Sequence, residues 1–165
     1  MYEKLEKYTV NMIPNTGYEV QGQWKDDVHD IRTRILFDYY TYKILEAEAT
    51  GVGTPFEVCH QGLSVINNLV GEQVRPGFNR VVKEKVMGKN GCMHIYELVM
   101  NSIKSALQAA ARQVPDWVED DDYQNRWAGW EMLYKDKCIY FSQPGVFDNS
   151  GDRVEQVQQA LIREK

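Results

Sequence analysis

The side chains best suited to chemistry in this 165-residue chain are its three cysteines and three histidines. Most of them fall in three short clusters, which are His29-Asp30, Cys59-His60 and Gly91-Cys92-Met93-His94. Thiolate and imidazole groups are the donors that zinc and iron favour in proteins. The same groups serve as nucleophile and base in thiol enzymes. The clusters therefore predict either a metal site or a thiol–imidazole site.

The first hypothesis is a metal site whose ligands are His29, Cys59, Cys92 and His94. Zinc is the expected cofactor, with iron as the alternative. An open coordination position would permit Lewis-acid catalysis or water activation, whereas a closed site would be structural. Glu97 follows His94 by three residues and shares its helix face, so it could orient the imidazole or bind the metal. The reserve ligands or outer contacts are Asp30, His60 and Cys138.

The second hypothesis is an enzyme that uses no metal and acts on a small aromatic substrate. His29 or His94 would supply acid–base chemistry near neutral pH, with Glu97 as a further catalytic group. Cys92 or Cys59 would be the nucleophile. The expected pocket between sheet and helices would be lined by Trp24, Tyr96, Trp127 and Trp130. A third hypothesis is a non-catalytic partner protein, because a free cysteine also packs as a small hydrophobe.

Composition excludes several other classes of protein. A net charge of -5 argues against nucleic-acid binding, which requires a basic face. Dinucleotide, phosphate-loop and serine-hydrolase motifs are missing, and no C-x-x-C pair occurs. The sequence contains no stretch of 18 apolar residues, so no membrane span is predicted. The N-terminus lacks the apolar core of a signal peptide. We therefore expect a cytoplasmic protein with reduced thiols. A small-molecule substrate and homo-oligomerisation are both compatible with this composition.

The chain length predicts one domain over residues 1–165, and the first fifty residues predict an antiparallel sheet. Apolar and polar residues alternate over 18–24, 31–37 and 45–49, which is typical of half-buried strands. Hairpin turns are expected at 26–27 and 38–41. By this alternation His29 faces inward with Ile31, and Asp30 faces the other way.

Helices are predicted for the remainder of the chain. Thr54 is expected to cap a helix that begins at Pro55, with an apolar stripe of Cys59, Leu63, Ile66 and Val70. The other expected elements are a short helix ending at Val86, a loop over 88–91, a long helix over 93–113, a helix over 121–134, a strand over 139–142, a turn over 148–151 and a terminal helix over 152–163. Strands followed by helices predict an α+β fold with the helices packed on one face of the sheet. One strand start and two helix starts would then meet at one end of the fold.

The chain resembles an uncharacterised bacterial family of unknown function, DUF2889, from Gly17 to about Gln113. The resemblance depends on short motifs that this sequence matches. They are His29-Asp30-Ile31, Pro55-Phe56-Glu57-Val58-Cys59, Leu69-Val70-Gly71, Pro76-Gly77-Phe78, the segment Gly91-Cys92-Met93-His94-Ile95-Tyr96-Glu97-Leu98, and Asp136-Lys137-Cys138. The resemblance implies a common fold and a shared site, but no activity. Met93 replaces a threonine of the family pattern, and the stretch before His29 is shorter than usual.

The order of elements is also similar to NifU-type iron–sulfur scaffold proteins and to the related SufE layout. Those scaffold proteins bind zinc or an iron–sulfur cluster through three cysteines and an aspartate. On this resemblance Asp30 would stand for the aspartate, and Cys59 with Cys92 or His94 for later ligands. The first cysteine of that family is absent here, where Val28-His29 occurs instead. The similarity concerns layout and assigns no activity.

Overall fold

The computed structural model describes residues 1–113 and 115–147. The chain divides into two compact units, Met1–Leu107 and Gln108–Lys165. The single domain predicted for residues 1–165 stays a prediction. All five cysteine and histidine residues of the three clusters belong to the first unit, which is therefore described first.

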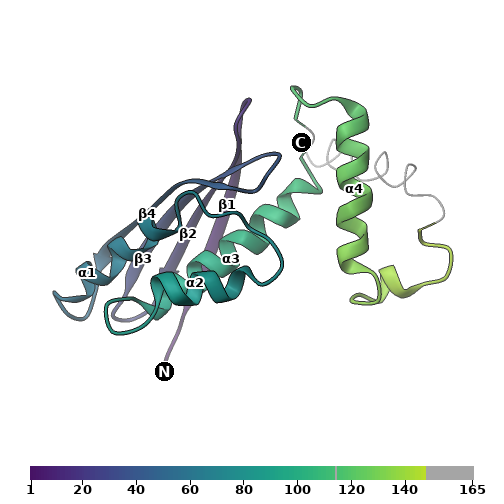
Figure 1. The fold of residues 1–165 in the computed structure, drawn as a ribbon. Helices are drawn as coiled ribbons and strands as arrows, with labels where there is room; N and C mark the ends of the chain where they lie inside the picture. Colours follow the sequence, from purple (N-terminus) through teal and green to yellow (C-terminus); the bar gives the residue numbers. More distant parts are fainter. Residues whose placement is uncertain (114, 148–165) are drawn as a thin grey trace. The chain divides into compact units, whose positions relative to one another are not determined.

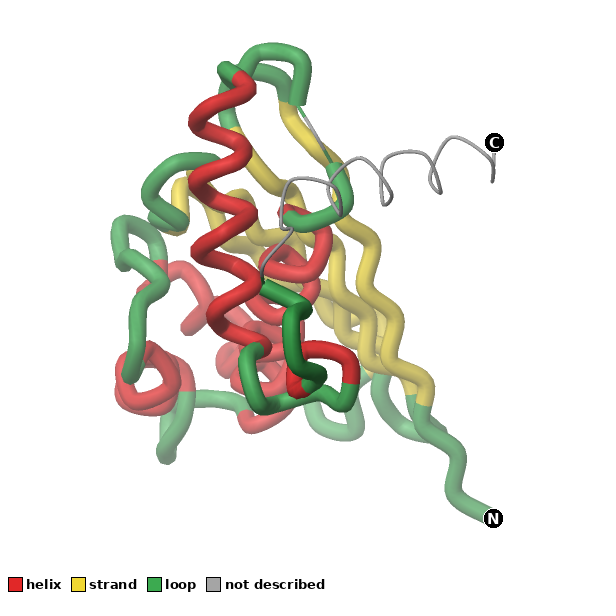
Figure 2. Tube along the Cα trace, turned by 90° about the vertical axis from the view of Figure 1, so that its right-hand side faces the viewer, coloured by secondary structure: helices red, strands yellow, loops and turns green. Residues whose placement is uncertain are grey.

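The first unit begins with an antiparallel meander of four strands, paired in chain order. The strands are β1 Leu5–Ile13, β2 Gly17–Lys25, β3 Asp30–Asp38 and β4 Ile44–Gly53. Figure 2 shows them running side by side as one sheet, with the N-terminal segment leading into β1. The strands predicted over 18–24, 31–37 and 45–49 are confirmed, and β1 extends the sheet by an edge strand.

The two faces of the sheet differ as the alternation predicts. Tyr18, Val20 and Trp24 of β2 are buried, whereas Gln21 on the opposite face is exposed. On β3 the inward residues Ile31 and Ile35 are almost completely buried. The outward face instead carries ion pairs centred on Arg34, whose guanidinium contacts the carboxylates of Glu19 (2.7 Å), Glu46 (2.6 Å) and Glu48 (3.5 Å). One face therefore forms the core, and the other is polar.

The helices that follow cover the apolar face of this sheet (Figure 1). They are α1 Cys59–Leu63, the 3₁₀ helix η1 Ser64–Leu69, α2 Phe78–Val86 and α3 Met93–Ala110. The buried stripe of α3 is Ile95, Leu98, Val99, Ser102, Ile103 and Ala106. At Gly22 a Cβ atom would lie 3.3 Å from a methyl group of Leu98, so α3 approaches the backbone of β2 closely. The α+β class and the helix ending at Val86 are confirmed.

Three predicted elements are corrected. The helix expected from Pro55 begins only at Cys59, because Thr54 Oγ1 donates to the carbonyl of Phe56 (3.2 Å) instead of capping a helix. The long helix ends at Ala110, three residues before the predicted end. The strand expected over 139–142 is instead the 3₁₀ helix η2 Tyr140–Ser142, in which the hydroxyl of Ser142 donates to the carbonyl of Cys138 (2.8 Å).

The second unit contains α4 Asp120–Tyr134, which confirms the helix predicted over 121–134, and then η2. Three acidic residues, Asp120, Asp121 and Asp122, occupy the first turn of α4, where the helix dipole favours negative charge. The turn predicted over 148–151 and the helix predicted over 152–163 lie outside the described residues. Within the described part of the chain, no helix is long and apolar enough to cross a bilayer.

Candidate functional site

The tight turn between β2 and β3 organises the candidate site around one carboxylate, that of Asp26. The backbone N–H groups of Val28 (3.0 Å) and His29 (2.7 Å) both donate to Asp26 Oδ1, and Asp26 N–H donates to the carbonyl of His29 (3.0 Å). An aspartate that accepts hydrogen bonds from its own turn is a recurrent way to fix such a loop. The turn therefore holds His29 in one position at the end of the sheet.

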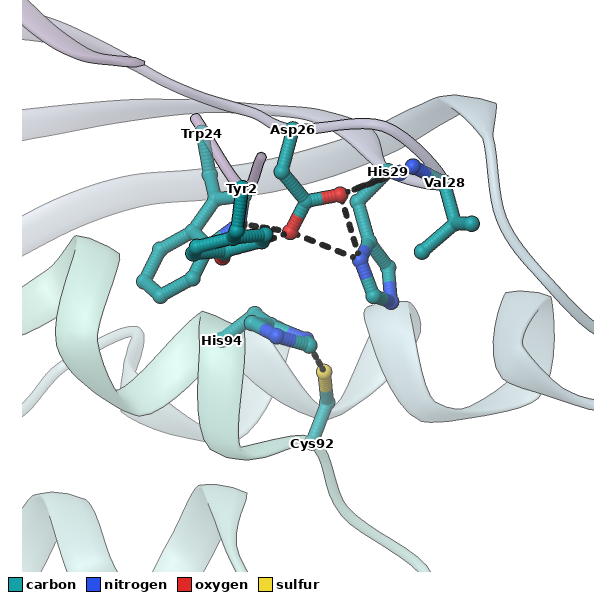
Figure 3. Close-up of polar contacts among 7 residues, drawn as sticks. All are labelled: Tyr2, Trp24, Asp26, Val28, His29, Cys92 and His94. Carbon is teal, nitrogen blue, oxygen red and sulfur yellow. Dashed lines mark hydrogen bonds and ion pairs between the residues drawn. The ribbon is translucent and has the colours of Figure 1, made fainter. Parts of the chain in front are cut away.

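Side chains complete the set of donors around Asp26 (Figure 3). Trp24 Nε1 donates to Oδ2 (3.0 Å), and the hydroxyl of Tyr2 reaches the same oxygen (3.3 Å). His29 Nδ1 lies 3.0 Å from Oδ1 and 3.1 Å from Oδ2. Only 4% of the Asp26 side chain is exposed. The carboxylate is thus largely buried, and donors surround it.

These contacts determine the charge of Asp26. Burial by itself would raise the pKa of the carboxyl group, but the hydrogen bonds from Trp24, Val28 and His29 outweigh it and lower the pKa well below the usual value. Asp26 is therefore ionised at neutral pH. An ionised carboxylate can only accept hydrogen bonds, so it holds the proton of His29 on Nδ1 and leaves Nε2 as an acceptor in the neutral ring.

A second pair of functional groups comes from the start of α3. Cys92 directly precedes the helix, and its carbonyl accepts the N–H of Tyr96 (3.2 Å), as in the first turn of a helix. The N–H of Cys92 donates to the carbonyl of Val86 (2.9 Å), which anchors the loop after α2. From this position Cys92 Sγ lies 3.9 Å from Nδ1 of His94. A dashed line marks this contact in Figure 3. The thiol and the imidazole are therefore direct neighbours.

The two histidine rings bring these two groups together. The ring centroids of His29 and His94 are 4.3 Å apart with an interplanar angle of 51°, and Trp24 contacts His94 edge-on at 4.6 Å. Burial is the largest cause that lowers the pKa of His94, and the nearby His29 lowers it further. The charges of Asp26 and Glu97 act in the opposite direction but do not prevail. His94 is therefore neutral near pH 7.

A neutral imidazole beside a thiol can accept its proton, and the resulting thiolate is the nucleophilic form of cysteine. His29 lies against His94 and is oriented by its hydrogen bond with the carboxylate of Asp26. The thiol of Cys92 thus contacts the imidazole of His94, and the ring of His94 packs against that of His29. His29 in turn bonds the buried carboxylate of Asp26. Such an arrangement can serve thiol chemistry or proton transfer.

The remaining predicted ligands and reserve residues are Cys59, His60 and Asp30, which lie on other elements than Cys92 and His94. Cys59 is the first residue of α1 and is partly buried. His60 is exposed, and its Nε2 lies 3.2 Å from Thr54 Oγ1. Asp30 accepts hydrogen bonds from Gln23 (2.9 Å) and Arg32 (3.3 Å) on the polar face of the sheet, as its position in the alternation predicts. The structure thus brings together His29, Cys92 and His94, whereas Asp30 belongs to the opposite face.

Two further predicted residues have clear placements. Glu97 lies on α3 one turn after His94 and acts on it through its charge. Cys138, predicted as a reserve ligand, is exposed in the second unit and precedes η2. Its exposure follows from the short helical turn at 140–142, which replaces the predicted strand.

The residues predicted to line an aromatic pocket are divided between the two units. Trp24 is only 5% exposed and lies within the site, and Tyr96 on α3 has Lys83 Nζ 5.9 Å from its ring centroid. Trp127 is buried within the second unit, and the side chain of Trp130 lies outside the described part. Two hollows in the first unit, of about 430 Å³ on the polar sheet face and about 490 Å³ between β4 and α1, are not lined by Cys92, His94 or His29.

No group of three or more His, Cys, Asp or Glu side chains among the described residues is arranged to hold a metal ion. The pair of Cys92 and His94 supplies two donors, and Nε2 of His29, whose ring contacts that of His94, is a candidate for a third. Cys59, the first residue of α1, could join them as a ligand only if α1 brought its thiol to the same ion. The metal hypothesis therefore stays a prediction.

Sequence analysis missed Asp26, which it assigned only to a hairpin turn. The available signal was an aspartate three residues before a histidine in a tight turn, a spacing at which an aspartate can accept hydrogen bonds from the backbone of the turn. It also missed the N-terminal segment, where Lys4 Nζ lies 4.1 Å from the ring centroid of Trp24. The contact of Lys4 with Trp24 joins segments distant in sequence and leaves no periodic signal.

Comparison with known proteins yields one match. A family model described as a protein of unknown function (DUF2889) matches residues 10–108, which include both histidines and both cysteines of the first unit that were predicted as ligands. Searches of curated proteins and of solved structures find no significant match.

The carboxylate of Asp26 provides a stability test. Replacing it with asparagine, Asp26→Asn, removes the negative charge and turns one acceptor atom into a donor that faces Trp24 or His29. We expect the free energy of unfolding in urea to fall by about 2–3 kcal/mol, the scale of hydrogen bonds to a charged group. The exposed neighbour offers a matched control, and Asp27→Asn should change stability by less than about 0.5 kcal/mol. Equal effects of the two variants would contradict this role for Asp26.

His94 provides a pH test. Because its folded-state pKa is lowered, the unfolded chain binds more protons in the window below the ordinary value of 6.5. The free energy of unfolding should therefore fall as pH drops from 7 through this window, by at most about 1.4 kcal/mol per pH unit for one proton. His94→Gln should flatten that slope, whereas the exposed control His60→Gln should retain it. Parallel slopes for the wild type and His94→Gln would contradict the prediction.

Proposed function

The chain belongs to the protein family of unknown function DUF2889, and we propose that it is a small enzyme that uses thiol and imidazole chemistry. Cys92 is the nucleophile in this proposal, and His94 is the base that accepts its proton. The observation that carries the proposal is the contact of 3.9 Å between Cys92 Sγ and Nδ1 of His94. The lowered pKa of His94 supports it, since only a neutral imidazole can act as a base.

His29 and Asp26 have a supporting role in this proposal. The carboxylate orients His29, whose ring lies against His94 at a centroid distance of 4.3 Å. A protonated His94 would gain from the negative charge of Asp26, which favours the charged imidazole. Asp26 can therefore stabilise the imidazolium that forms on His94 when Cys92 loses its proton, whereas the ring of His29 opposes that charge. In a nucleophile–base–carboxylate set the carboxylate bonds the base directly, whereas Asp26 bonds His29 and acts on His94 through its charge.

A small-molecule substrate fits the proposal, because Cys92 and His94 are partly rather than fully buried. Thiol chemistry of this kind requires a reduced cysteine, and all three cysteines are free. We therefore propose a reducing, cytoplasmic compartment.

Selective alkylation tests the proposal. In a background that carries Cys59→Ser and Cys138→Ser, iodoacetamide should alkylate Cys92, and His94→Gln should slow that reaction by about tenfold at pH 7, because the thiolate is the reacting form. Mass spectrometry of quenched samples gives the rate. The matched control is His60→Gln, which should leave the rate unchanged. Equal rates for His94→Gln and its parent would refute the role of His94 as base.

A second candidate function is metal binding, which one observation favours. The Nδ1 of His29 is held by the Asp26 carboxylate, an arrangement that also orients histidines whose other nitrogen binds a metal. Zinc, or alternatively iron, would then be bound by His29, Cys92 and His94, with Cys59 as the fourth ligand. The metal would supply Lewis-acid chemistry if a coordination position stayed open.

Elemental analysis of the purified protein distinguishes the two candidates. Metal binding predicts close to one equivalent of zinc or iron that is lost in Cys92→Ala, and about 10–100-fold weaker metal affinity in Asp26→Asn. Metal-free protein with a reactive, His94-dependent Cys92 supports the thiol enzyme. Metal-free protein with an inert Cys92 would refute both and favour a non-catalytic partner protein.

A further inference from the structure

Helix α1 contacts the residue that carries the proposed nucleophile. At Gly62 a Cβ atom would lie 3.5 Å from the Cβ of Cys92 and 3.2 Å from the carbonyl oxygen of Gly91. The second distance is tighter than most contacts of real Cβ atoms, so a larger residue at this position would force its neighbours to shift. Glycine here allows α1 to pack directly against the start of α3.

This packing places a second thiol close to Cys92. Cys59 precedes Gly62 by three residues in α1, and residues at this spacing share a helix face with Cβ atoms about 5–6 Å apart. The Cβ atoms of Cys59 and Cys92 are therefore separated by at most about 9.5 Å, the sum of this spacing and the 3.5 Å from the Gly62 Cβ position to the Cβ of Cys92. Both thiols are partly buried and free, whereas Cys138 is exposed in the second unit.

The start of α1 is held mainly by backbone hydrogen bonds to the turn before it, in which Cys59 N–H donates to the carbonyl of Phe56 (3.0 Å) and His60 N–H donates to that of Glu57 (3.2 Å). The helix has five residues, its N-cap residue Val58 makes no side-chain capping hydrogen bond, and the neighbouring Phe56 is 68% exposed. Leu63, at the other end, is 4% exposed and anchors the helix. Segments with few buried contacts move at low free-energy cost. A disulfide requires a Cβ separation of about 3.5–4.5 Å, so α1 must shift by several ångströms toward the start of α3 before Cys59 and Cys92 can bond.

We infer that Cys59 is the resolving thiol of this site and that its substrates are small disulfides. The inference rests on the proposed function, since it takes Cys92 as the nucleophile. The Cys92 thiolate attacks one sulfur of the substrate, the substrate S–S bond breaks, and the first half leaves as a thiolate. Cys59 then attacks the Cys92 sulfur of the mixed disulfide. The second half leaves as a thiol, a bond joins Cys59 to Cys92, and the substrate has been reduced by the two protein thiols.

The test uses full-length protein carrying Cys138→Ser, treated with chelator and then with one equivalent of dithiodipyridine. We expect both halves of the reagent to be released as the coloured thione. The intact protein should lose the mass of two hydrogens and carry no adduct. Peptide mapping should join the peptides of Cys59 and Cys92. The variant Cys59→Ser should release only one half and keep a stable adduct on Cys92.

The control variant Cys92→Ser should form no internal disulfide, and circular dichroism confirms that each variant is folded. If Cys59→Ser does not fold, Cys59→Ala takes its place. A persistent adduct on Cys92 in the presence of Cys59 would overturn the inference, as would adducts on both thiols without a bond between them. The proposed function would survive that result if alkylation of Cys92 still depended on His94, so the two failures can be distinguished.

Discussion

The buried carboxylate of Asp26 is the constraint on which the candidate site depends. A charge removed from water is costly unless hydrogen bonds replace its solvation. Here the indole of Trp24, the ring of His29 and two backbone N–H groups of the turn supply them. Because these donors come from both ends of the β2–β3 turn, they are satisfied together only when the turn has one conformation. The same bonds that solvate the carboxylate therefore also orient His29.

The second half of the site depends on the packing of α3 against the sheet. His94 lies in its first turn and Cys92 directly precedes it. The burial of Ile95 and Leu98, one and four residues after His94, therefore fixes the direction of both side chains. Burial also gives His94 its chemical character, because it lowers the pKa of the imidazole and keeps the ring neutral. The burial of His94 has opposite effects on the stability of the fold in acid and on the supply of neutral imidazole that thiol chemistry needs. A partly buried imidazole that resists protonation weakens the fold in mild acid, but it stays available to accept a proton from the thiol.

The elements around Cys92 differ in how firmly they are held. The start of α3 belongs to an 18-residue helix with a continuous buried stripe, whereas α1 is a single short turn of helix held by Leu63 and by the close approach of Gly62 to Cys92. A firm element thus carries the thiol–imidazole pair, and a weakly held one carries the second thiol. This division suits a site in which one thiol is positioned in advance and the other arrives later.

Local sequence patterns were sufficient to predict the alternation of the strands, the facing of His29 and Asp30, the end of α2 and most of α3, because periodicity and turn residues depend only on near neighbours. The sequence failed at Thr54, where a side chain bonded to the carbonyl of Phe56 rather than capping a helix, and over 139–142, where a short apolar run fits a strand or a helical turn equally well. It indicated which thiols and imidazoles were worth attention. Only the tertiary structure decided that His29, His94 and Cys92 meet, and that Asp26 rather than Asp30 is their carboxylate. The reason is physical: a hydrogen bond or ring contact depends on distances between segments, and packing of α3 on the sheet sets those distances without leaving a local pattern in the chain.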